Sequence, residues 1–362
     1  MREMSSMDIM LLLNELKLLT GGRFQKTYQN DKRLRFEIHL SEKGTFELYF
    51  EPGRLFITEY KRKFEQPGSF AMLMRKHLKN QSILNIRQKD FDRIIEIETE
   101  NYILILEVFS KGNVILCYKD YKILMPLQFQ KWKHRTIRPG IKYEYPPAVK
   151  NPFTISLEEF KNTLNEKETV KFLATDMSFS GLYAEEICIR SGIDKNKVAN
   201  QLTDQEIENI YEVMKHLKNE FGPQIIVDSG KIIDAIPFDM KCYSGIEMIR
   251  STTFTHALDE FYSKSEEIRN EVDQTKKIQK SVEKLQRIVD QQRQSIETLK
   301  KDEENSRKVA EIVFSNLQPI NDVISQINEM KNKGMKWNDI KERLKNQIKD
   351  INEKTGKVIL DI

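Results

Sequence analysis

Apolar residues near the start of the chain recur at the spacing of an amphipathic helix. Between residues 8 and 19, the apolar positions on one helical face are Ile9, Leu12, Leu13 and Leu16. Ser5 or Ser6 is suited to cap the first turn, and Gly21-Gly22 is suited to end the helix. The pattern therefore predicts a helix at the N-terminus.

The chain then changes to the two-residue period of β-strands. Segments that alternate between apolar and polar residues, or run apolar, are residues 35–40, 45–50, 54–58, 94–98, 102–109 and 114–117. Gly44, Pro52-Gly53 and Gly112-Asn113 separate them as turns. This arrangement predicts a meandering, mostly antiparallel sheet.

One amphipathic helix interrupts these strands, and Ser69 is suited to cap it. Its two faces would carry Phe70, Leu73, Met74, His77 and Leu78 on one side and Arg75, Lys76 and Lys79 on the other. We therefore expect a helix over residues 69–79 that buries an apolar side and exposes a basic one.

A second helical zone covers about residues 156–221. Within it, Phe179-Ser180-Gly181-Leu182 and Ser191-Gly192-Ile193 form turns between short helices. Such a helix–glycine turn–helix unit can offer backbone N–H groups to a nucleic-acid phosphate. An ordinary helical hairpin is the simpler interpretation of these residues alone. Strands return between Gln224 and Ile249, so the helices are predicted to be an insertion between two sheet lobes.

From Thr255 onward the pattern becomes that of a coiled coil. The repeating positions are Ile268, Thr275, Ile278, Val282, Leu285, Val289, Gln292, Ile296 and Leu299. A seam of this kind needs a partner helix. Two later helices, predicted over residues 308–332 and 336–351 and divided by Gly334, are too short to supply it. We expect the partner in residues outside this chain or in another molecule.

The predicted fold class is α+β, with an antiparallel β-rich N-terminal domain, a helical insertion and a long coiled-coil helix. The expected divisions are a first lobe at 1–155, a helix-hairpin-helix insertion at 156–221, completing strands at 222–254, a coiled-coil helix at 255–304 and a small helical middle region at 305–362.

Charge is nearly balanced overall but clustered locally. The chain has 59 basic and 55 acidic residues and a net charge of +4. Basic residues gather in the first part of the chain as Lys61-Arg62-Lys63, as Arg75, Lys76 and Lys79, and as Lys131, Lys133, Arg135 and Arg138. Such clusters attract polyanions, although a solvated charged surface is the more common explanation for any single cluster.

The sequence shows no motif typical of a nucleotide-binding or catalytic site. It contains no GxxxxGK(S/T), HExxH or GxSxG motif, and no GxGxxG motif after a strand. Cys117, Cys188 and Cys242 are too far apart for a zinc pair, and His39 and His77 are expected to be structural. We expect no enzyme activity, cofactor or metal. Without an apolar signal core or membrane span, a cytoplasmic protein is expected.

Two acidic positions have both a functional and a structural interpretation. Asp92-Arg93 precedes a predicted strand, where the arginine could bind phosphate and the aspartate could orient it. A local ion pair at the strand end is the structural alternative. Asp8 lies in a helix's first turn, where a carboxylate also interacts favourably with the helix dipole.

Several segments together resemble one known family. They are Ser69 to Lys79, Asp92-Arg93-Ile94-Ile95, Lys111 to Leu116, Ile236-Pro237-Phe238-Asp239 and Ala257 to Tyr262. In this order along the chain they resemble the NFACT family, which comprises bacterial and archaeal proteins once named fibronectin-binding protein A-like and the eukaryotic nuclear export mediator factor. The present sequence is archaeal-like.

The resemblance implies a role in ribosome-associated quality control. It implies binding to large ribosomal subunits obstructed by peptidyl-tRNA, recruitment of charged tRNA and untemplated C-terminal tailing of the stalled nascent chain, with peptide-bond chemistry left to the ribosome. Bacterial members favour alanyl-tRNA. Asp8, Asp92 and Arg93 match positions tied to tRNA recruitment. Further nucleic-acid contacts are expected at Arg75, Lys76, Lys79, Lys131, Lys133, Arg135 and Gly181.

Departures from the family pattern leave alternatives. The family continues into a returning coiled-coil helix and a C-terminal RNA-binding domain, which we expect to be absent after Ile362, weakening ribosome engagement and leaving the coiled coil open to self-association. The family's N-terminal domain also resembles formamidopyrimidine-DNA glycosylases, but Arg2 stands where those enzymes use proline. A generic RNA-binding protein, a glycosylase and a fibronectin-binding adhesin are the alternatives, in that order.

Overall fold

The structure is a computed structural model that describes residues 2–60, 62, 68–148, 150–352 and 355–360, with the side chains of residues 267–277 outside this description. The chain divides into two compact units, Met1–Asn270 and Glu271–Ile362. The predicted coiled-coil positions Ile268 and Thr275 therefore fall outside the described side chains.

Helix α1 (Ser6–Leu16) begins with a capping box, in which the Asp8 N–H donates to Ser5 Oγ at 3.1 Å and the Ser5 N–H donates to Asp8 Oδ2 at 2.7 Å. A short 3₁₀ turn, Lys17–Leu19, follows it. The predicted N-terminal helix is confirmed, and Ser5 is its cap.

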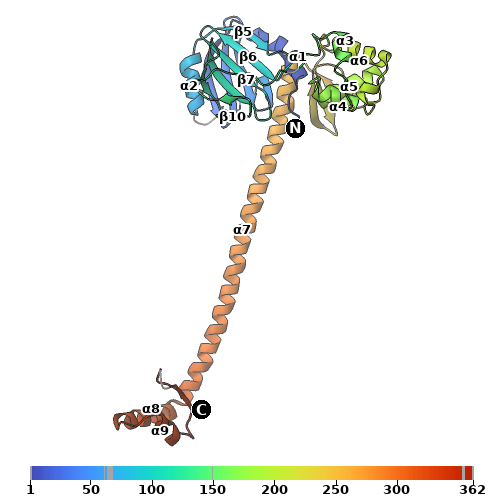
Figure 1. Cartoon of the computed structure of the whole chain (residues 1–362). Coiled ribbons are helices and arrows are strands. Elements are labelled where there is room, and N and C mark those ends of the chain that lie inside the picture. Colours follow the sequence, from blue (N-terminus) through green and yellow to red (C-terminus); the bar gives the residue numbers. More distant parts are fainter. Residues whose placement is uncertain (1, 61, 63–67, 149, 353–354, 361–362) are drawn as a thin grey trace. The chain divides into compact units, whose positions relative to one another are not determined.

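Two antiparallel sheets form the first lobe (Figure 1). One contains β1 (Arg23–Asn30), β2 (Arg33–Leu40), β3 (Gly44–Glu51) and β4 (Arg54–Thr58), and the other contains β5 (Ile83–Gln88), β6 (Ile94–Thr99), β7 (Tyr102–Glu107), β8 (Asn113–Tyr118) and β9 (Ile123–Pro126). Neighbouring strands follow chain order in both sheets. Phe36 and Leu48 of the first sheet share a core with Leu104 of the second. The predicted antiparallel meander is confirmed.

Helix α2 (Ser69–Leu78) separates the two sheets in sequence. It buries Phe70, Met74 and Leu78, as the pattern predicts. The predicted cap at Ser69 is wrong, because Gly68 has the extended conformation of the capping position and Ser69 lies within the first turn. After β9, a small hairpin pairs β10 (Gln130–Lys131) with β11 (Thr136–Ile137).

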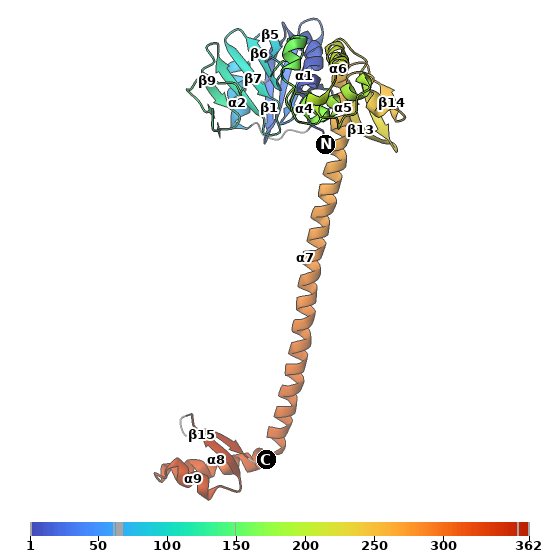
Figure 2. The same cartoon turned by 45° about the vertical axis from the view of Figure 1, so that its right-hand side comes forward.

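A helical region follows and packs against the N-terminus of α1 (Figure 2). Its helices are α3 (Leu157–Lys161), α4 (Thr169–Thr175), α5 (Ser180–Ser191) and α6 (Asp204–Leu217), with 3₁₀ turns at Ala199–Gln201 and Lys241–Tyr243. Strands return as predicted, in the order β13 (Lys231–Ile236), β12 (Gln224–Asp228), β14 (Glu247–Arg250). The proposed divisions after residues 155, 221 and 254 remain predictions.

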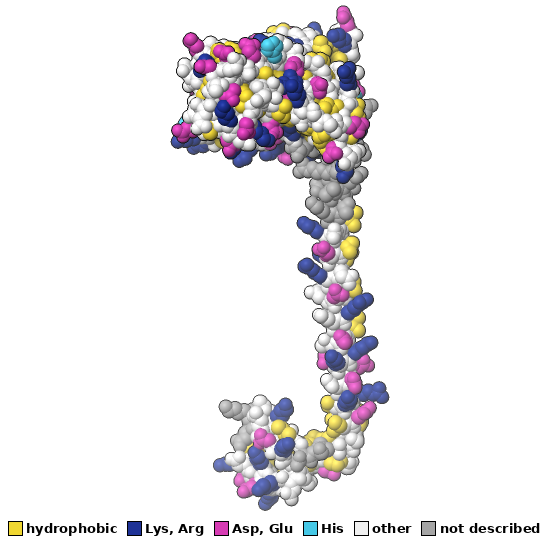
Figure 3. Space-filling view, turned by 90° about the vertical axis from the view of Figure 1, so that its right-hand side faces the viewer, with side chains coloured by type: hydrophobic (Ala, Val, Ile, Leu, Met, Phe, Trp, Pro, Cys, Tyr) yellow, Lys and Arg dark blue, Asp and Glu magenta, His cyan; other side chains and the backbone are white. Residues whose placement is uncertain are grey.

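Helix α7 (Phe254–Ser315) contains the predicted coiled-coil segment and continues past residue 304. The described seam residues are exposed, with Ile278 at 65%, Leu285 at 62% and Leu299 at 66%. Figure 3 shows hydrophobic side chains along one side of this helix. An apolar seam of this kind lowers its free energy when a second surface covers it.

The middle region is not wholly helical, which corrects the prediction for residues 305–362. Helices α8 (Leu317–Asn332) and α9 (Trp337–Arg343) are followed by a hairpin of β15 (Ile348–Asn352) and β16 (Lys357–Leu360). Ile348 and Ile351 have helical spacing, but a β-bulge between Ile348 and Asp350 shifts the strand register. Both isoleucines are therefore buried in the same small core.

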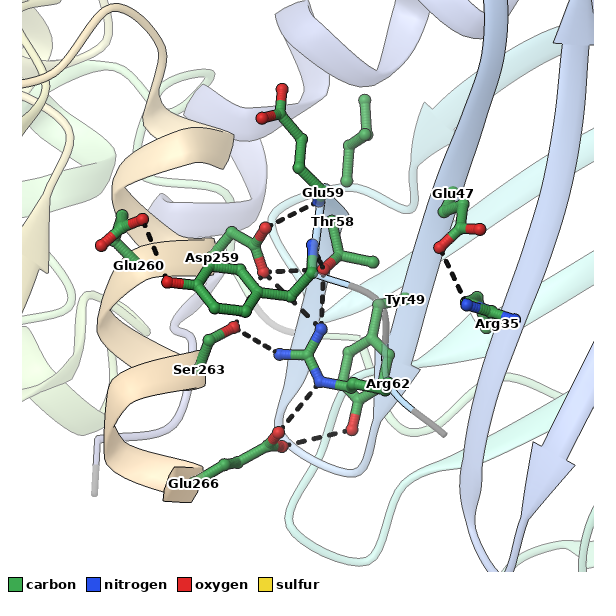
Figure 4. A network of polar contacts seen from close by, with 12 residues as sticks. Arg35, Glu47, Tyr49, Thr58, Glu59, Arg62, Asp259, Glu260, Ser263 and Glu266 are labelled. Atoms are coloured by element: carbon green, nitrogen blue, oxygen red, sulfur yellow. Dashed lines mark hydrogen bonds and ion pairs between the residues drawn. The ribbon is translucent and has the colours of Figure 1, made fainter. Parts of the chain in front are cut away.

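Helix α7 is anchored to the first lobe at its start. The N–H groups of Phe254 and Thr255 each donate to the Glu15 carboxylate of α1 at 2.7 Å, which satisfies donors that no helical carbonyl reaches. Asp259 accepts from Thr58 Oγ1 and from the Glu59 N–H, both at 2.8 Å (Figure 4). These contacts join α1, β4 and α7.

Arg62, predicted to belong to a basic surface cluster, is instead part of this anchor. Its Nε lies 2.9 Å from Glu266 Oε2, and its guanidinium stacks over the Tyr49 ring at 4.3 Å (Figure 4). The positive charge of Arg62 is therefore paired with a carboxylate of the same chain. Lys61 and Lys63, predicted for the same cluster, lie outside the described residues.

We expect Asp259→Ala to lower the free energy of unfolding by about 3 kcal/mol, because it removes one of the two carboxylates beside Arg62 and leaves the buried Thr58 hydroxyl and the part-buried Glu59 N–H without their acceptor. Urea denaturation measures the change. The partly exposed neighbour Glu260, replaced by alanine, should cost less than about 1 kcal/mol. Equal losses for the two variants would contradict the anchoring role of Asp259.

Candidate nucleic-acid interface

Asp8 is completely buried, and its carboxylate is fully used in internal hydrogen bonds. Asp8 Oδ2 accepts from the Ser5 N–H at 2.7 Å, from Ser5 Oγ at 2.8 Å and from Arg2 Nη1 at 2.7 Å. Asp8 Oδ1 accepts from the Tyr183 hydroxyl of α5 at 2.6 Å. The carboxylate thus joins the N-terminal segment, α1 and α5.

Arg2 completes this cluster and connects it to two further elements, β13 and α7. Its Nε donates to Asp234 Oδ1 of β13 at 2.8 Å, and its Nη2 donates to the Ala235 carbonyl at 2.8 Å. The Arg2 carbonyl accepts from the Tyr262 hydroxyl of α7 at 3.1 Å. Burial alone would lower the pKa of Arg2, but Asp8 and Asp234 raise it above its ordinary value, so the guanidinium stays charged.

Sequence reasoning missed Arg2 and Tyr183 as partners of Asp8, and Asp234 as the second carboxylate that binds Arg2. Tyr183 lies 175 residues beyond Asp8, Asp234 lies 232 residues beyond Arg2, and none of the three matches a local motif. Only the placement of Asp8 at the third position of a capped helix was visible in the sequence.

The Asp92-Arg93 pair occupies the turn between β5 and β6. Asp92 Oδ1 accepts from the Arg93 N–H at 2.7 Å, and burial raises the pKa of Asp92 against the opposing effect of that hydrogen bond. The Gln88 side-chain amide donates to the Asp92 carbonyl and to the Ser6 carbonyl of α1, each at 2.9 Å. The turn is therefore bonded to the first turn of α1.

Phe91, within the same turn, connects it to the start of α5. The Phe91 ring lies 5.4 Å from Phe179 and 5.2 Å from Phe153 in edge-to-face contacts. Phe179 immediately precedes α5, and Gly181 is exposed in that helix's first turn. The structure thus places the predicted residues Asp8, Asp92 and Gly181 on segments that contact one another.

The predicted turn at Phe179-Ser180-Gly181-Leu182 is wrong in position. Gly181 lies inside α5, and the positive φ angles that reverse the chain belong to Ser178 (59°) and Ser180 (68°). Phe179, between these two serines, is completely buried. The second predicted turn is confirmed, because Gly192 ends α5 in the left-handed conformation.

Arg93 borders a cavity of about 420 Å³. The cavity is lined by Arg93, Lys111, His134 and Arg135 among the basic and imidazole side chains, by the rings of Phe109, Trp132 and Tyr145, and by Glu107, Ser110, Pro146 and Pro147. The Arg93 guanidinium stacks over Phe109 at 5.0 Å, and Arg93 Nη1 lies 3.4 Å from Glu3 Oε2. The Arg93 side chain is 31% exposed, so solvent reaches this guanidinium.

Glu107, the one acidic side chain among the described lining residues, is internally paired. It is 1% exposed and accepts from Arg135 Nη1 at 2.6 Å, from Arg135 Nη2 at 3.2 Å and from the Tyr143 hydroxyl at 2.7 Å. These hydrogen bonds fix the Arg135 side chain, which forms part of the cavity lining. Lys131 and Lys133 flank Trp132 in sequence, and all three are exposed. Lys131 and Lys133 do not line the cavity, but Lys111 does and is exposed, so the cavity combines an exposed cation with a 43% exposed indole.

The basic residues of α2 form a second surface. Arg75 Nε donates to the Thr27 carbonyl at 2.8 Å, whereas Lys76 and Lys79 are exposed. Figure 1 shows α2 and α5 at opposite sides of the two sheets. Neither Lys76 nor Lys79 lines the Arg93 cavity.

The cysteines and histidines offer no reactive cluster in the described part of the chain. Burial raises the pKa of the Cys188 thiol to about 11 and the pKa values of Cys117 and Cys242 to about 12. His77 Nδ1 is hydrogen-bonded to the Tyr102 hydroxyl at 2.8 Å. Among the described residues, no three His, Cys, Asp or Glu side chains are placed to hold a metal, and no helix has the length and apolar character to span a membrane.

The antiparallel sheets and the separate helices make this an α+β protein with a β-rich N-terminal part, as the sequence predicts. Residues 5–357 match the family of NFACT N-terminal and middle domains. The chain belongs to the NFACT family.

Two curated relatives, one archaeal and one human, are similar to this chain. The archaeal Rqc2 homolog aRqcH of Methanocaldococcus jannaschii is 32% identical over 99% of this chain and 58% of its own length. The human ribosome quality control complex subunit NEMF is 26% identical over 93% of this chain and 35% of its own length. The chain thus spans about half, or less, of these relatives.

Solved structures show the same fold. A fibrinogen binding protein from Staphylococcus aureus aligns with a TM-score of 0.60 and 24% identity over 71% of this chain and 98% of its own. The N-terminal part of the fibronectin/fibrinogen-binding protein from Streptococcus suis aligns with a TM-score of 0.58 and 23% identity over 72% and 99%. A LlFpg–DNA complex aligns with a TM-score of only 0.34, which supports no inference.

We expect Arg2→Met to lower the free energy of unfolding by about 3–5 kcal/mol, because it leaves the buried Asp8 and Asp234 carboxylates without their shared cation. Chemical denaturation measures the loss. Arg33→Met, at a partly exposed ion pair with Glu51, is the matched control and should cost less than about 1 kcal/mol. An Arg2→Met variant as stable as that control would show that the buried cluster is dispensable.

Proposed function

We propose that this chain acts in ribosome-associated quality control. In this role it binds large ribosomal subunits obstructed by peptidyl-tRNA, recruits charged tRNA and supports untemplated C-terminal tailing of the stalled nascent chain. Family membership and the names of the relatives, which include the human ribosome quality control complex subunit, support this role. The ribosome would supply peptide-bond chemistry, so the chain itself is proposed to be non-catalytic and cytoplasmic.

The cavity beside Asp92-Arg93 is the observation that best supports tRNA binding. Its volume of about 420 Å³ is within the range of small-molecule sites and suits one unpaired nucleotide. Exposed Trp132 offers a face on which a base can stack, and the Arg93 guanidinium can bind the adjoining phosphate. We propose that one unstacked tRNA nucleotide occupies this cavity.

The three recruitment residues would then have different tasks. Arg93 contacts RNA after its ion pair with the exposed Glu3 opens, which costs little because both side chains are solvated. Asp92 holds the turn through the Arg93 N–H. Asp8 is buried, so we propose that it acts by fixing α1 against α5 and makes no contact with RNA.

Other basic residues would extend the contact along the phosphate backbone. Lys131 and Lys133 lie beside Trp132, and Lys76 and Lys79 offer a second exposed surface on α2. Arg75 and Arg135 are held by internal contacts, so we propose that they support these surfaces. The exposed first turn of α5 at Gly181 presents backbone N–H groups suited to a phosphate. A preference for alanyl-tRNA is proposed from the family resemblance.

The exposed seam of α7 supports self-association as a further proposal. The seam has β-branched residues at one repeating position (Val282, Val289 and Ile296) and leucines at the other (Leu285 and Leu299). This combination favours a coiled coil of two parallel helices. Sedimentation equilibrium over a range of concentrations would reveal a monomer–dimer equilibrium.

We expect Arg93→Ala to weaken tRNA binding about tenfold and to reduce the slope of log K against log salt by about one, because one phosphate contact is lost. Trp132→Ala should weaken binding by about five- to 100-fold, with a smaller change in slope, because stacking releases no counterion. Filter binding at several salt concentrations measures both quantities.

Arg23→Ala, at the exposed first residue of β1, is the charge-matched control and should bind tRNA nearly as the unaltered chain does. Equal losses in Arg23→Ala and Arg93→Ala would contradict a site at the cavity. A generic RNA-binding protein would be the remaining interpretation.

A further inference from the structure

We propose that Gln88 is a positioning residue that holds Arg93 in place for RNA, by bonding the Asp92-Arg93 turn to the first turn of α1. This inference rests on the proposed function, because it assigns Gln88 a task in tRNA recruitment. The two hydrogen bonds of Gln88 are features of the structure and do not depend on that function.

Gln88 is the last residue of β5 and is half-buried. Its side-chain nitrogen donates to two carbonyl oxygens, Ser6 O at 2.9 Å and Asp92 O at 2.9 Å. A primary amide has two N–H groups, so one side chain satisfies both acceptors at once. Neither an apolar side chain nor a carboxylate of the same length can do so.

Both ends of this bridge are themselves fixed. Ser6 follows the Ser5 cap, and Ser5 is bonded to the buried Asp8 carboxylate. At the other end, Asp92 Oδ1 accepts the Arg93 N–H at 2.7 Å, and the Arg93 carbonyl accepts the Val108 N–H at 2.7 Å. Gln88 therefore connects the surroundings of Asp8 to Arg93 through consecutive hydrogen bonds.

The turn has other attachments that should keep it folded without Gln88. The Lys89 N–H donates to the Ile94 carbonyl at 2.9 Å, the Asp92 N–H donates to the Lys89 carbonyl at 3.0 Å, and Phe91 is 1% exposed. Loss of the Gln88 amide is therefore expected to move or loosen the turn without unfolding the lobe. An arginine displaced by about 1 Å loses much of its contact with a phosphate.

The test uses Gln88→Leu, which removes the donors, and Gln88→Glu, which sets a carboxylate against two carbonyl oxygens. Asn85→Asp is the matched control for charge, because Asn85 is exposed on the same strand. Hydrogen–deuterium exchange of the peptide covering residues 89–95 should be faster in both Gln88 variants and unchanged in Asn85→Asp. Unchanged exchange in the Gln88 variants would overturn the inference, whatever the RNA result.

The RNA readout separates positioning from general stability. Gln88→Leu should weaken tRNA binding about fivefold and lower the salt slope as Arg93→Ala does. Added to Arg93→Ala, it should cause less than about a twofold further loss, because residues that act through one contact are not additive. A fivefold loss in both backgrounds would overturn the positioning role. If Arg93→Ala itself bound tRNA as tightly as the unaltered chain, the proposed function would fail, and the exchange result would still report on the bridge.

Discussion

The arrangement of the first unit depends on one largely buried cation, the Arg2 guanidinium, whose side chain is 19% exposed. The Arg2 guanidinium lies between the Asp8 and Asp234 carboxylates, with Nη1–Oδ2 and Nε–Oδ1 distances of 2.7 and 2.8 Å. A charge removed from water is tolerable only when opposite charges and hydrogen bonds replace its hydration. Tyr183 donates to the same Asp8 carboxylate, and Tyr262 donates to the Arg2 carbonyl. One cluster therefore fixes α1, α5, β13 and α7 relative to one another.

Helix α1 carries this constraint in two directions. At its start, the Ser5–Asp8 capping box holds the Ser6 carbonyl where the Gln88 amide reaches it, and so locates the turn that bears Arg93. At its end, Glu15 accepts the first N–H groups of α7. The proposed RNA site and the base of the long helix are consequently attached to opposite ends of the same short element.

Hydrophobic periodicity predicted the elements that obey a single period, such as α1, the two sheets and α7. It failed where tertiary packing chooses between conformations: the bulge in β15 places Ile348 and Ile351 on one face of a strand, although their spacing is helical. Composition grouped Arg62 with surface cations because its partners, Asp259 and Glu266, are remote in sequence. The Asp92-Arg93 pair was identified by resemblance, but its cavity with Trp132 required the fold, and no sequence pattern indicated Arg2.

Ultraviolet cross-linking on large ribosomal subunits that carry peptidyl-tRNA and charged tRNA would test the central claim most directly. Cross-linked peptides would be identified by mass spectrometry, and the attached tRNAs by sequencing. The account predicts tRNA cross-links to the peptides that contain Arg93 and Trp132, on obstructed subunits in preference to empty ones. Equal binding to empty subunits and bulk RNA, with cross-links spread over surface lysines, would contradict it.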